Sequence, residues 1–272
     1  MLRLPRAAIA SLTIAAVALC TLAAVRPLQA QEGAGATGPN AQAANTLPLK
    51  PARTHTFTTS KGTWISLDLS PDGKTIVFDM LGKLYTMPAT GGKATAITSG
   101  LEFDAQPRFS PDGKRIVFVS DRSGGDNLWI MSLDMKDTVQ LTKGNDNLFV
   151  SPVFTPDGKY VVASKTLGPL GGSAKLWMYN VDGGTGVALL NGAPPTLKTI
   201  GAAFGKDARY IWYAARQGDW QYNAIGPQYQ LYVYDRENGK TSQMSTRQGS
   251  ALPAAAPRSR LSSRFGRRHR MP

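Results

Sequence analysis

The chain has 272 residues, of which 42% are apolar, and a formal net charge of +13. That length is enough for a folded domain with a sizeable core. Nine of the positive charges belong to arginines in residues 1–30 and 252–272, so residues 31–251 carry only +4 and predict no basic surface for nucleic acid. Cys20 is the only cysteine, which excludes an internal disulfide and a cysteine-ligated metal site.

Residues 1–30 are typical of a secretory signal peptide. Arg3 and Arg6 form a basic start, residues 7–25 are apolar and rich in alanine, and Ala30 is a small residue at the expected cut. An uncleaved membrane anchor is the alternative, but the serine and threonine residues within the apolar run favour cleavage. We therefore expect a periplasmic or secreted protein without a stable membrane span.

Residues 31–56 predict a flexible lead-in to the folded domain. They are rich in alanine, glycine, glutamine and asparagine and show no apolar periodicity.

A five-residue motif then recurs along the chain. Its copies are residues 70–74, 110–114 and 155–159, with a worn fourth copy at residues 205–209, and successive copies are 40, 45 and 50 residues apart. Proline favours the first corner of a tight turn, aspartate bonds its own backbone, and glycine supplies the positive φ that closes the turn. The predicted structural turn residues are Pro71, Asp72, Gly73, Pro111, Asp112, Gly113, Pro156, Asp157 and Gly158.

Each turn lies between short apolar runs that predict β-strands. The runs that precede the turns are residues 64–69, 106–109, 150–154 and 199–204, and those that follow as inner strands are residues 75–78, 115–119, 160–163 and 210–213. A third, aromatic-centred run follows at residues 83–87, 127–131, 175–179 and 230–234, and then a polar turn and a fourth short run. Four short strands per ~45-residue repeat predict a propeller blade.

Residues 103–122 resemble the TolB-type, WD-like β-propeller repeat, and the resemblance extends from residue 60 to about residue 250. Such propellers occur in TolB and before the catalytic domains of secreted amidohydrolases and prolyl-oligopeptidase-like peptidases. The resemblance implies an all-β fold over residues 57–251. Because this family has more blades than the four visible here, we expect a partial propeller of four four-stranded antiparallel blades in an open arc.

The sequence predicts no catalytic, cofactor or metal site. It contains no H-x-H, H-E-x-x-H or G-x-S-x-G motif and no phosphate-binding glycine loop. The recurring Asp72, Asp112, Asp157 and Asp207 could form a ring that binds a cation, but a local bond within each turn explains them better. Asp121 and Arg122 lie in a longer loop, where we expect a surface ion pair.

Aromatic residues gather near the fourth repeat and predict a contact surface. Trp212, Trp220, Tyr222 and Tyr229 lie in or beside a long insertion between two strands, and loops on rigid scaffolds often carry recognition residues. The expected partner is a protein or a missing catalytic domain, and no nucleic acid.

Residues 252–272 contain six arginines, no acidic residue and no strand pattern, and they predict a disordered basic tail. The hypothesis is that a shift of reading frame produced this tail. The favoured function is an exported, non-catalytic propeller, truncated from the N-terminal part of an amidohydrolase-like hydrolase and acting in substrate gating or protein interaction. The alternative is a TolB-like protein-binding propeller of the cell envelope.

Overall fold

The structure, a computed structural model, describes residues 52–53, 55–167, 174–190, 198–205, 207–216, 228–246 and 249–253. The regular elements in these ranges are sixteen β-strands, which form four four-stranded antiparallel sheets. Each sheet uses four strands that are consecutive in the chain. The predicted basic tail and lead-in lie largely outside the described residues.

The first sheet consists of β1 (Leu67–Leu69), β2 (Thr75–Met80), β3 (Lys83–Pro88) and β4 (Thr95–Ala96). The second consists of β5 (Asp104–Phe109), β6 (Arg115–Ser120), β7 (Asn127–Ser132) and β8 (Thr138–Gln140). The third consists of β9 (Asn147–Phe154), β10 (Tyr160–Leu167), β11 (Lys175–Asn180) and β12 (Val187–Ala188). The fourth consists of β13 (Lys198–Phe204), β14 (Tyr210–Arg216), β15 (Gln230–Asp235) and β16 (Thr241–Gln243).

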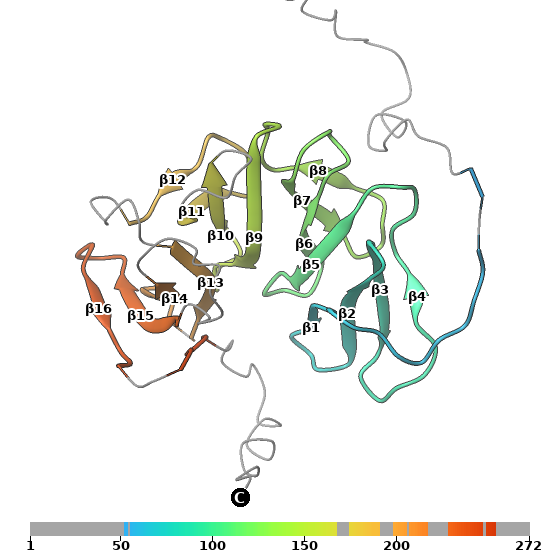
Figure 1. The fold of residues 1–272 in the computed structure, drawn as a ribbon, viewed down its shortest axis with the longest axis horizontal. Coiled ribbons are helices and arrows are strands. Elements are labelled where there is room, and N and C mark those ends of the chain that lie inside the picture. Colours follow the sequence, from blue (N-terminus) through green and yellow to red (C-terminus); the bar gives the residue numbers. More distant parts are fainter. Residues whose placement is uncertain are drawn as a thin grey trace, which may run out of the picture. The chain divides into compact units, whose positions relative to one another are not determined.

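The four sheets follow one another around a centre as the blades of a propeller (Figure 1). The first strand of each sheet lies nearest the centre and the fourth lies at the outside. Neighbouring blades contact each other largely through β5, β9 and β13, and the arc is open between the fourth sheet and the first. This confirms the predicted all-β partial propeller of four antiparallel blades.

The apolar run after each turn is explained by burial on both faces of the sheet. In β6, Ile116 and Phe118 pack toward the first sheet, whereas Val117 and Val119 pack toward the third. A strand covered on both sides reads as a continuous apolar run. The runs predicted as inner strands are therefore the second strand of each sheet, with a paired neighbour on either side.

The core consists of three layers, one between each pair of successive sheets. Trp129 of β7 is almost fully buried in the first layer, and Tyr213 of β14 is fully buried in the third. Large aromatic side chains at these positions hold neighbouring blades together through buried apolar area.

The first strand is shorter than predicted. We expected a strand from residue 64, but β1 begins at Leu67 because Trp64 has a φ of 59° and so cannot continue an extended strand. The ladder is nevertheless extended at Ser66, whose carbonyl accepts from the N–H of Asp79 at 3.0 Å.

The first strands of the other three sheets share a β-bulge. Gln106, Ser151 and Gly201 have φ angles of 57°, 55° and 68°, and the pairing register shifts beside each of them. A bulge re-aims the strand and increases its twist.

Residues 249–253 begin along the same path as a further first strand. The N–H of Ala251 donates to the carbonyl of Tyr229 at 2.8 Å, as the N–H of Thr199 does to Ala174 at 2.8 Å one blade earlier. In both cases the acceptor directly precedes the third strand of the preceding sheet. Pro253 then lies against Gly201, with Cγ 3.7 Å from where a Cβ on that glycine would be.

Candidate functional site

The turns of the repeated motif contain the sequence Pro-Asp-Gly, and we call them P-D-G turns. Hydrogen bonds from their own side chains stabilise them. In the second sheet the hydroxyl of Ser110 donates to Asp112 Oδ1 at 2.5 Å, and Ser110 Oγ accepts from the N–H of Arg115 at 2.9 Å. The same aspartate oxygen accepts from the N–H of Lys114 at 3.0 Å. The hydroxyl bond is the main cause that lowers the pKa of Asp112. The other two turns repeat this bond with Ser70 and Asp72, and with Thr155 and Asp157.

Successive turns contact one another. A Cβ on Gly113 would lie 3.4 Å from Pro71 Cδ, and one on Gly158 would lie 3.7 Å from Pro111 Cδ. Arg115 also donates from Nη2 to the carbonyl of Gly158 at 3.3 Å. The three turns therefore form a row on one side of the propeller.

The opposite side carries the loops that join the second strand of each sheet to the third and the fourth to the next sheet. We call it the loop face, and its described loops are residues 81–82, 97–103, 121–126 and 141–146. Residues 217–229 join β14 to β15. Residues 217–227 are not described, so the predicted contact residues Trp220 and Tyr222 lie outside the described residues.

The two described members of the predicted contact surface are not neighbours. Trp212 pairs with Val233, which is four residues beyond Tyr229 and so roughly 13 Å away along β15. Tyr229 Oη accepts a hydrogen bond from Arg216 Nε at 3.2 Å, and its ring lies 5.6 Å from that guanidinium. Both aromatic side chains are half-buried.

A pocket opens between the first and second sheets on the loop face. Its volume is about 300 Å³, and it is lined from segments 63–66, 79–82 and 103–106. These segments are the start of the first blade, the end of β2 with the following turn, and the start of β5. The pocket therefore lies where one blade meets the next.

Large apolar side chains surround this pocket and remain exposed. Trp64 is 100% exposed, Leu81 75% and Phe103 61%. Trp64 and Leu81 have positive φ angles of 59° and 53°, a conformation that costs energy for residues with a side chain. Scattered exposed apolar residues are common, but three of them around one pocket indicate a contact surface.

We call these three exposed side chains the rim of the pocket, and acidic groups lie beneath them. Asp79 Oδ1 accepts from the N–H of Ser66 at 2.8 Å, and Oδ2 accepts from the N–H of Gln106 at 2.7 Å. Asp104 is fully buried beside it, and both aspartates line the pocket.

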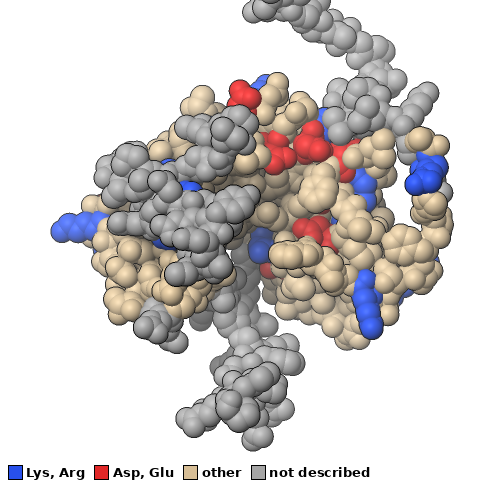
Figure 2. Space-filling view, in the orientation of Figure 1, with Lys and Arg blue, Asp and Glu red and all other residues tan. Residues whose placement is uncertain are grey.

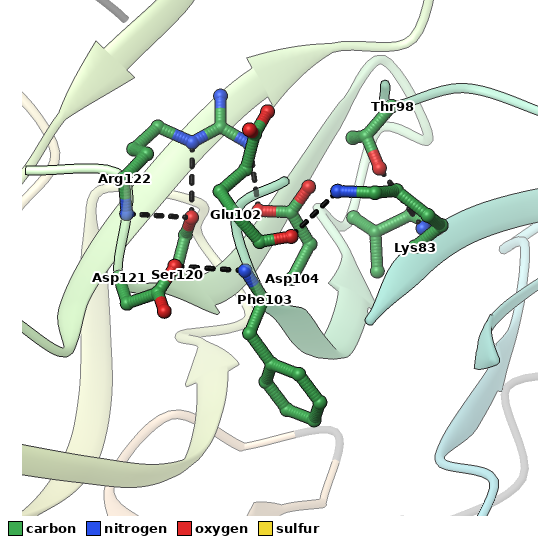
Figure 3. A network of polar contacts seen from close by, with 9 residues as sticks. Lys83, Thr98, Glu102, Phe103, Asp104, Ser120, Asp121 and Arg122 are labelled. Carbon is green, nitrogen blue, oxygen red and sulfur yellow. Dashed lines mark hydrogen bonds and ion pairs between the residues drawn. The ribbon is translucent and has the colours of Figure 1, made fainter. Parts of the chain in front are cut away.

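Arg122 is buried, whereas the sequence predicted it in a surface ion pair. Its Nη2 lies 2.7 Å from Asp104 Oδ1 and 3.9 Å from Glu102 Oε1, and its Nε donates to Ser120 Oγ at 3.0 Å (Figure 3). Its guanidinium also lies 5.1 Å from the ring of Trp129. The carboxylates of the neighbouring strand and loop draw Arg122 inward, and local sequence does not show that neighbourhood.

Charge is unevenly divided over the loop face. The first two sheets and their loops contribute the acidic residues Asp79, Glu102, Asp104, Asp121 and Asp126, and Figure 2 shows acidic atoms gathered over the region of β5–β8. The third and fourth sheets place Lys165, Lys175, Lys198 and Arg216 at the corresponding strand ends. Burial, and then the charge of Asp121, raises the pKa of Asp126.

The described ranges contain no group of three His, Cys, Asp or Glu side chains placed to hold a metal ion. The same part of the chain contains no helix long and apolar enough to cross a membrane.

The site residues Trp64, Asp79, Phe103, Asp104 and Arg122 were not singled out by sequence reasoning as a group. Two of them, Phe103 and Asp104, open the segment that carries the repeat resemblance. Phe103 and Asp104 lie close to the turn between β2 and β3 only because the first two blades pack against each other.

Comparison with known proteins identifies relatives of this chain. Residues 46–219 match the TolB beta propeller domain family. A stretch of 58 residues, 21% of this chain, is 41% identical to the Tol-Pal system protein TolB of Bordetella pertussis, and it covers 13% of that protein.

Solved structures show the same fold. TolB from Acinetobacter baumannii is 22% identical over 71% of this chain and 46% of that one, with a TM-score of 0.54. A puromycin-hydrolyzing peptidase from Mycobacterium tuberculosis is 14% identical over 71% of this chain and 30% of that one, with a TM-score of 0.52. The chain thus spans less than half the length of each of these relatives.

Proposed function

Because this chain belongs to the TolB beta propeller domain family, we propose that it is an exported, non-catalytic propeller that binds a protein partner through its loop face. The observation that carries this proposal is the exposed rim of Trp64, Leu81 and Phe103 around the pocket between the first two blades. Aromatic side chains at the edge of a pocket are typical anchors of protein interfaces.

The division of charge supports the same proposal. Acidic groups outnumber basic ones among the described loop-face residues of the first two blades, and basic groups lie at the corresponding strand ends of the last two. Complementary charges steer a partner and fix its orientation. A partner with one basic and one acidic region would thus dock in a single orientation.

The signal peptide predicted for residues 1–30 supports the proposal that this protein acts in the periplasm or outside the cell. N-terminal sequencing of the protein from a fractionated host tests this. Cleavage near Gln31 is expected, and an intact start at Met1 in the membrane fraction would contradict it.

A photo-crosslinking amino acid at Phe103 tests the binding function. Phe103 is exposed beside the pocket, and Val139 on the outer strand β8 is a matched control with a similar exposed fraction, 57% against 61%. A discrete crosslinked partner from position 103 and none from position 139 is expected. Equal crosslinking from both positions would argue against a specific contact surface.

A second candidate is the propeller portion of a larger, amidohydrolase-like hydrolase, in which the blades gate substrate or hold the catalytic domain. The path of residues 249–253 is compatible with it, because the N–H of Ala251 donates to the carbonyl of Tyr229 as the N–H of the first-strand residue Thr199 donates to that of Ala174. Pro253 follows Ala251 by two residues, as Gly201 follows Thr199 in the blade before. Gly201 has a φ of 68°, an angle that proline cannot adopt. This supports a change of reading frame near residue 252.

The nucleotide sequence beyond codon 251 separates the two candidates. A further P-D-G motif followed by H-x-H strings in another frame would indicate an amidohydrolase, and G-x-S-x-G a peptidase. A stop after a few more blades would indicate a binding protein. Absence of any P-D-G motif in the other frames would reject the frame shift.

A further inference from the structure

The cluster beneath the pocket contains more negative than positive charge. Three carboxylates, those of Asp79, Glu102 and Asp104, are buried there. The described positive groups beside them are the buried Arg122 and the half-buried Lys83, whose Nζ donates to the carbonyl of Glu102 at 2.5 Å. One negative charge is therefore left over, and a buried charge is costly unless it is paired.

Two of these carboxylates keep one oxygen without a partner among the described residues, and one of the two, Asp104, lines the pocket. Its Oδ1 is paired with Arg122 at 2.7 Å, but its Oδ2 is buried and accepts no hydrogen bond from the described residues. Glu102 Oε2 is likewise buried and accepts no hydrogen bond from the described residues. Most buried polar atoms have a partner, so an acceptor of this kind beside a pocket points to a donor supplied from outside.

The rim indicates the chemistry of that donor. Trp64 and Phe103 present aromatic rings at the pocket, and aromatic faces attract cations. A metal ion would need several oxygen ligands, which apolar side chains do not supply. An organic cation suits both surfaces, because its carbon atoms meet the rim and its charge lies beside the buried carboxylate of Asp104.

We propose that this pocket binds an organic cation, the ammonium or guanidinium group of a lysine or arginine side chain in a basic peptide segment. The volume of about 300 Å³ is at the lower end of the range for ligand pockets, about 300–1,000 Å³, and suits one side chain. The inference rests on the proposed binding function and names the chemistry of the partner at the same surface.

Fluorescence anisotropy with the purified full chain tests the proposal. The probe is a labelled pentapeptide with one arginine between glycines, and its control carries citrulline, which keeps the shape and lacks the charge. The arginine peptide is expected to bind at least about tenfold more tightly, the effect of losing a charge-assisted hydrogen bond. Equal binding of the two peptides would overturn the proposal.

Free agmatine distinguishes a small cation from a peptide as the source of the group. If the peptide binds at least about tenfold more tightly than agmatine, contacts beyond the guanidinium contribute to affinity. Comparable affinity of the two would assign the pocket to small cations and overturn the peptide part of the proposal.

Two variants test the residues. Asp104→Asn keeps an oxygen for Arg122 and removes the charge, and Trp64→Ala changes a side chain that is 100% exposed and so leaves folding intact. Each is expected to weaken the arginine peptide at least about fivefold. Asp134→Asn and Val139→Ala, both exposed on the second blade, are the matched controls and should bind normally. Unchanged binding by Trp64→Ala would overturn the proposal even if Asp104→Asn fails to fold.

The outcome is separable from the proposed function. A partner captured from position 103, together with equal binding of the arginine and citrulline peptides, rejects the cation pocket and leaves the protein-binding function standing. Selective arginine binding without a captured partner supports the pocket and rejects the protein-binding function.

Discussion

The carboxylate of Asp79, in the first blade, accepts a hydrogen bond from the backbone N–H of Gln106, in the second, at 2.7 Å. The side chain of Gln106 continues this link, because its Oε1 accepts from the N–H of Ser151 in the third blade at 2.5 Å. Gln106 and Ser151 are bulge residues with positive φ. The bulges thus expose N–H groups that the preceding blade can bind.

We predict that Gln106→Ala destabilises the protein by about 1 kcal/mol, because the N–H of Ser151 loses its acceptor. The urea midpoint of the full chain measures this change. Gln243→Ala, in the exposed outer strand β16, is the control and should leave the midpoint unchanged.

Gln106→Gly separates the hydrogen bond from the backbone conformation. Glycine adopts the φ of 57° without the penalty of about 1 kcal/mol that other residues meet in the left-handed region. The glycine variant should therefore lose less stability than the alanine variant. A larger loss from glycine would show that the bulge is not strained.

The row of P-D-G turns leads to a paired prediction. Gly73 and Gly113 have φ angles of 73° and 71°, but a Cβ on Gly113 would meet Pro71 at 3.4 Å, whereas one on Gly73 would meet nothing within 4 Å. Either change to alanine should cost about 1–2 kcal/mol through the backbone, and Gly113→Ala should cost slightly less, because its added Cβ gains an ordinary van der Waals contact with Pro71. Thermal unfolding of the two variants checks the order, and equal losses would argue against contact between the turns.

Replacing Arg122 should be the most damaging of these changes. Arg122→Met leaves Glu102 and Asp104 buried without their positive partner, and breaking a buried pair in this way costs about 3–5 kcal/mol. Urea unfolding measures the loss. Lys136→Met is the matched control, because Lys136 pairs with Asp134 at 3.1 Å in an exposed position, and no measurable change is expected there. A mild effect of Arg122→Met would show that the cluster is hydrated.

Acid should weaken the turns. The hydroxyl of Ser110, and then the N–H of Lys114, lower the pKa of Asp112 in the folded protein, while the pKa of an aspartate in the unfolded chain is about 3.9. A lowered folded pKa contributes stability that is present above about pH 4 and is lost as the pH falls through the folded value.

Ser110→Ala removes the main cause of this lowered pKa. The difference in thermal midpoint between the unaltered protein and the variant should therefore shrink as the pH falls from about 5 to 2. A difference that stays constant over this range would show that the hydroxyl stabilises the turn without acting through the charge of Asp112.

The blade itself could be predicted from sequence because its signals are local. Pro111, Asp112 and Gly113 form a turn with bonds that span at most five residues, and the apolar run of β6 follows directly. Each signal depends on neighbours in the chain, so the repeat shows it in every copy.

The candidate site could not be predicted in the same way. Asp79 and Gln106 are 27 residues apart in the chain, and Arg122 reaches Asp104 over 18 residues. Arg122 was predicted at the surface because a loop arginine beside an aspartate is usually solvated. Trp64 was predicted in a strand, and only its positive φ leaves it exposed at the pocket.

The sequence by itself determined the type of turn, the number of strands in each blade and the number of visible blades, because hairpin corners and alternating burial depend on short stretches of chain. Only the tertiary structure decided which side chains face one another where two blades meet. The pocket, its buried acidic groups and its exposed rim arise there, since the blades pack through residues that no local pattern brings together.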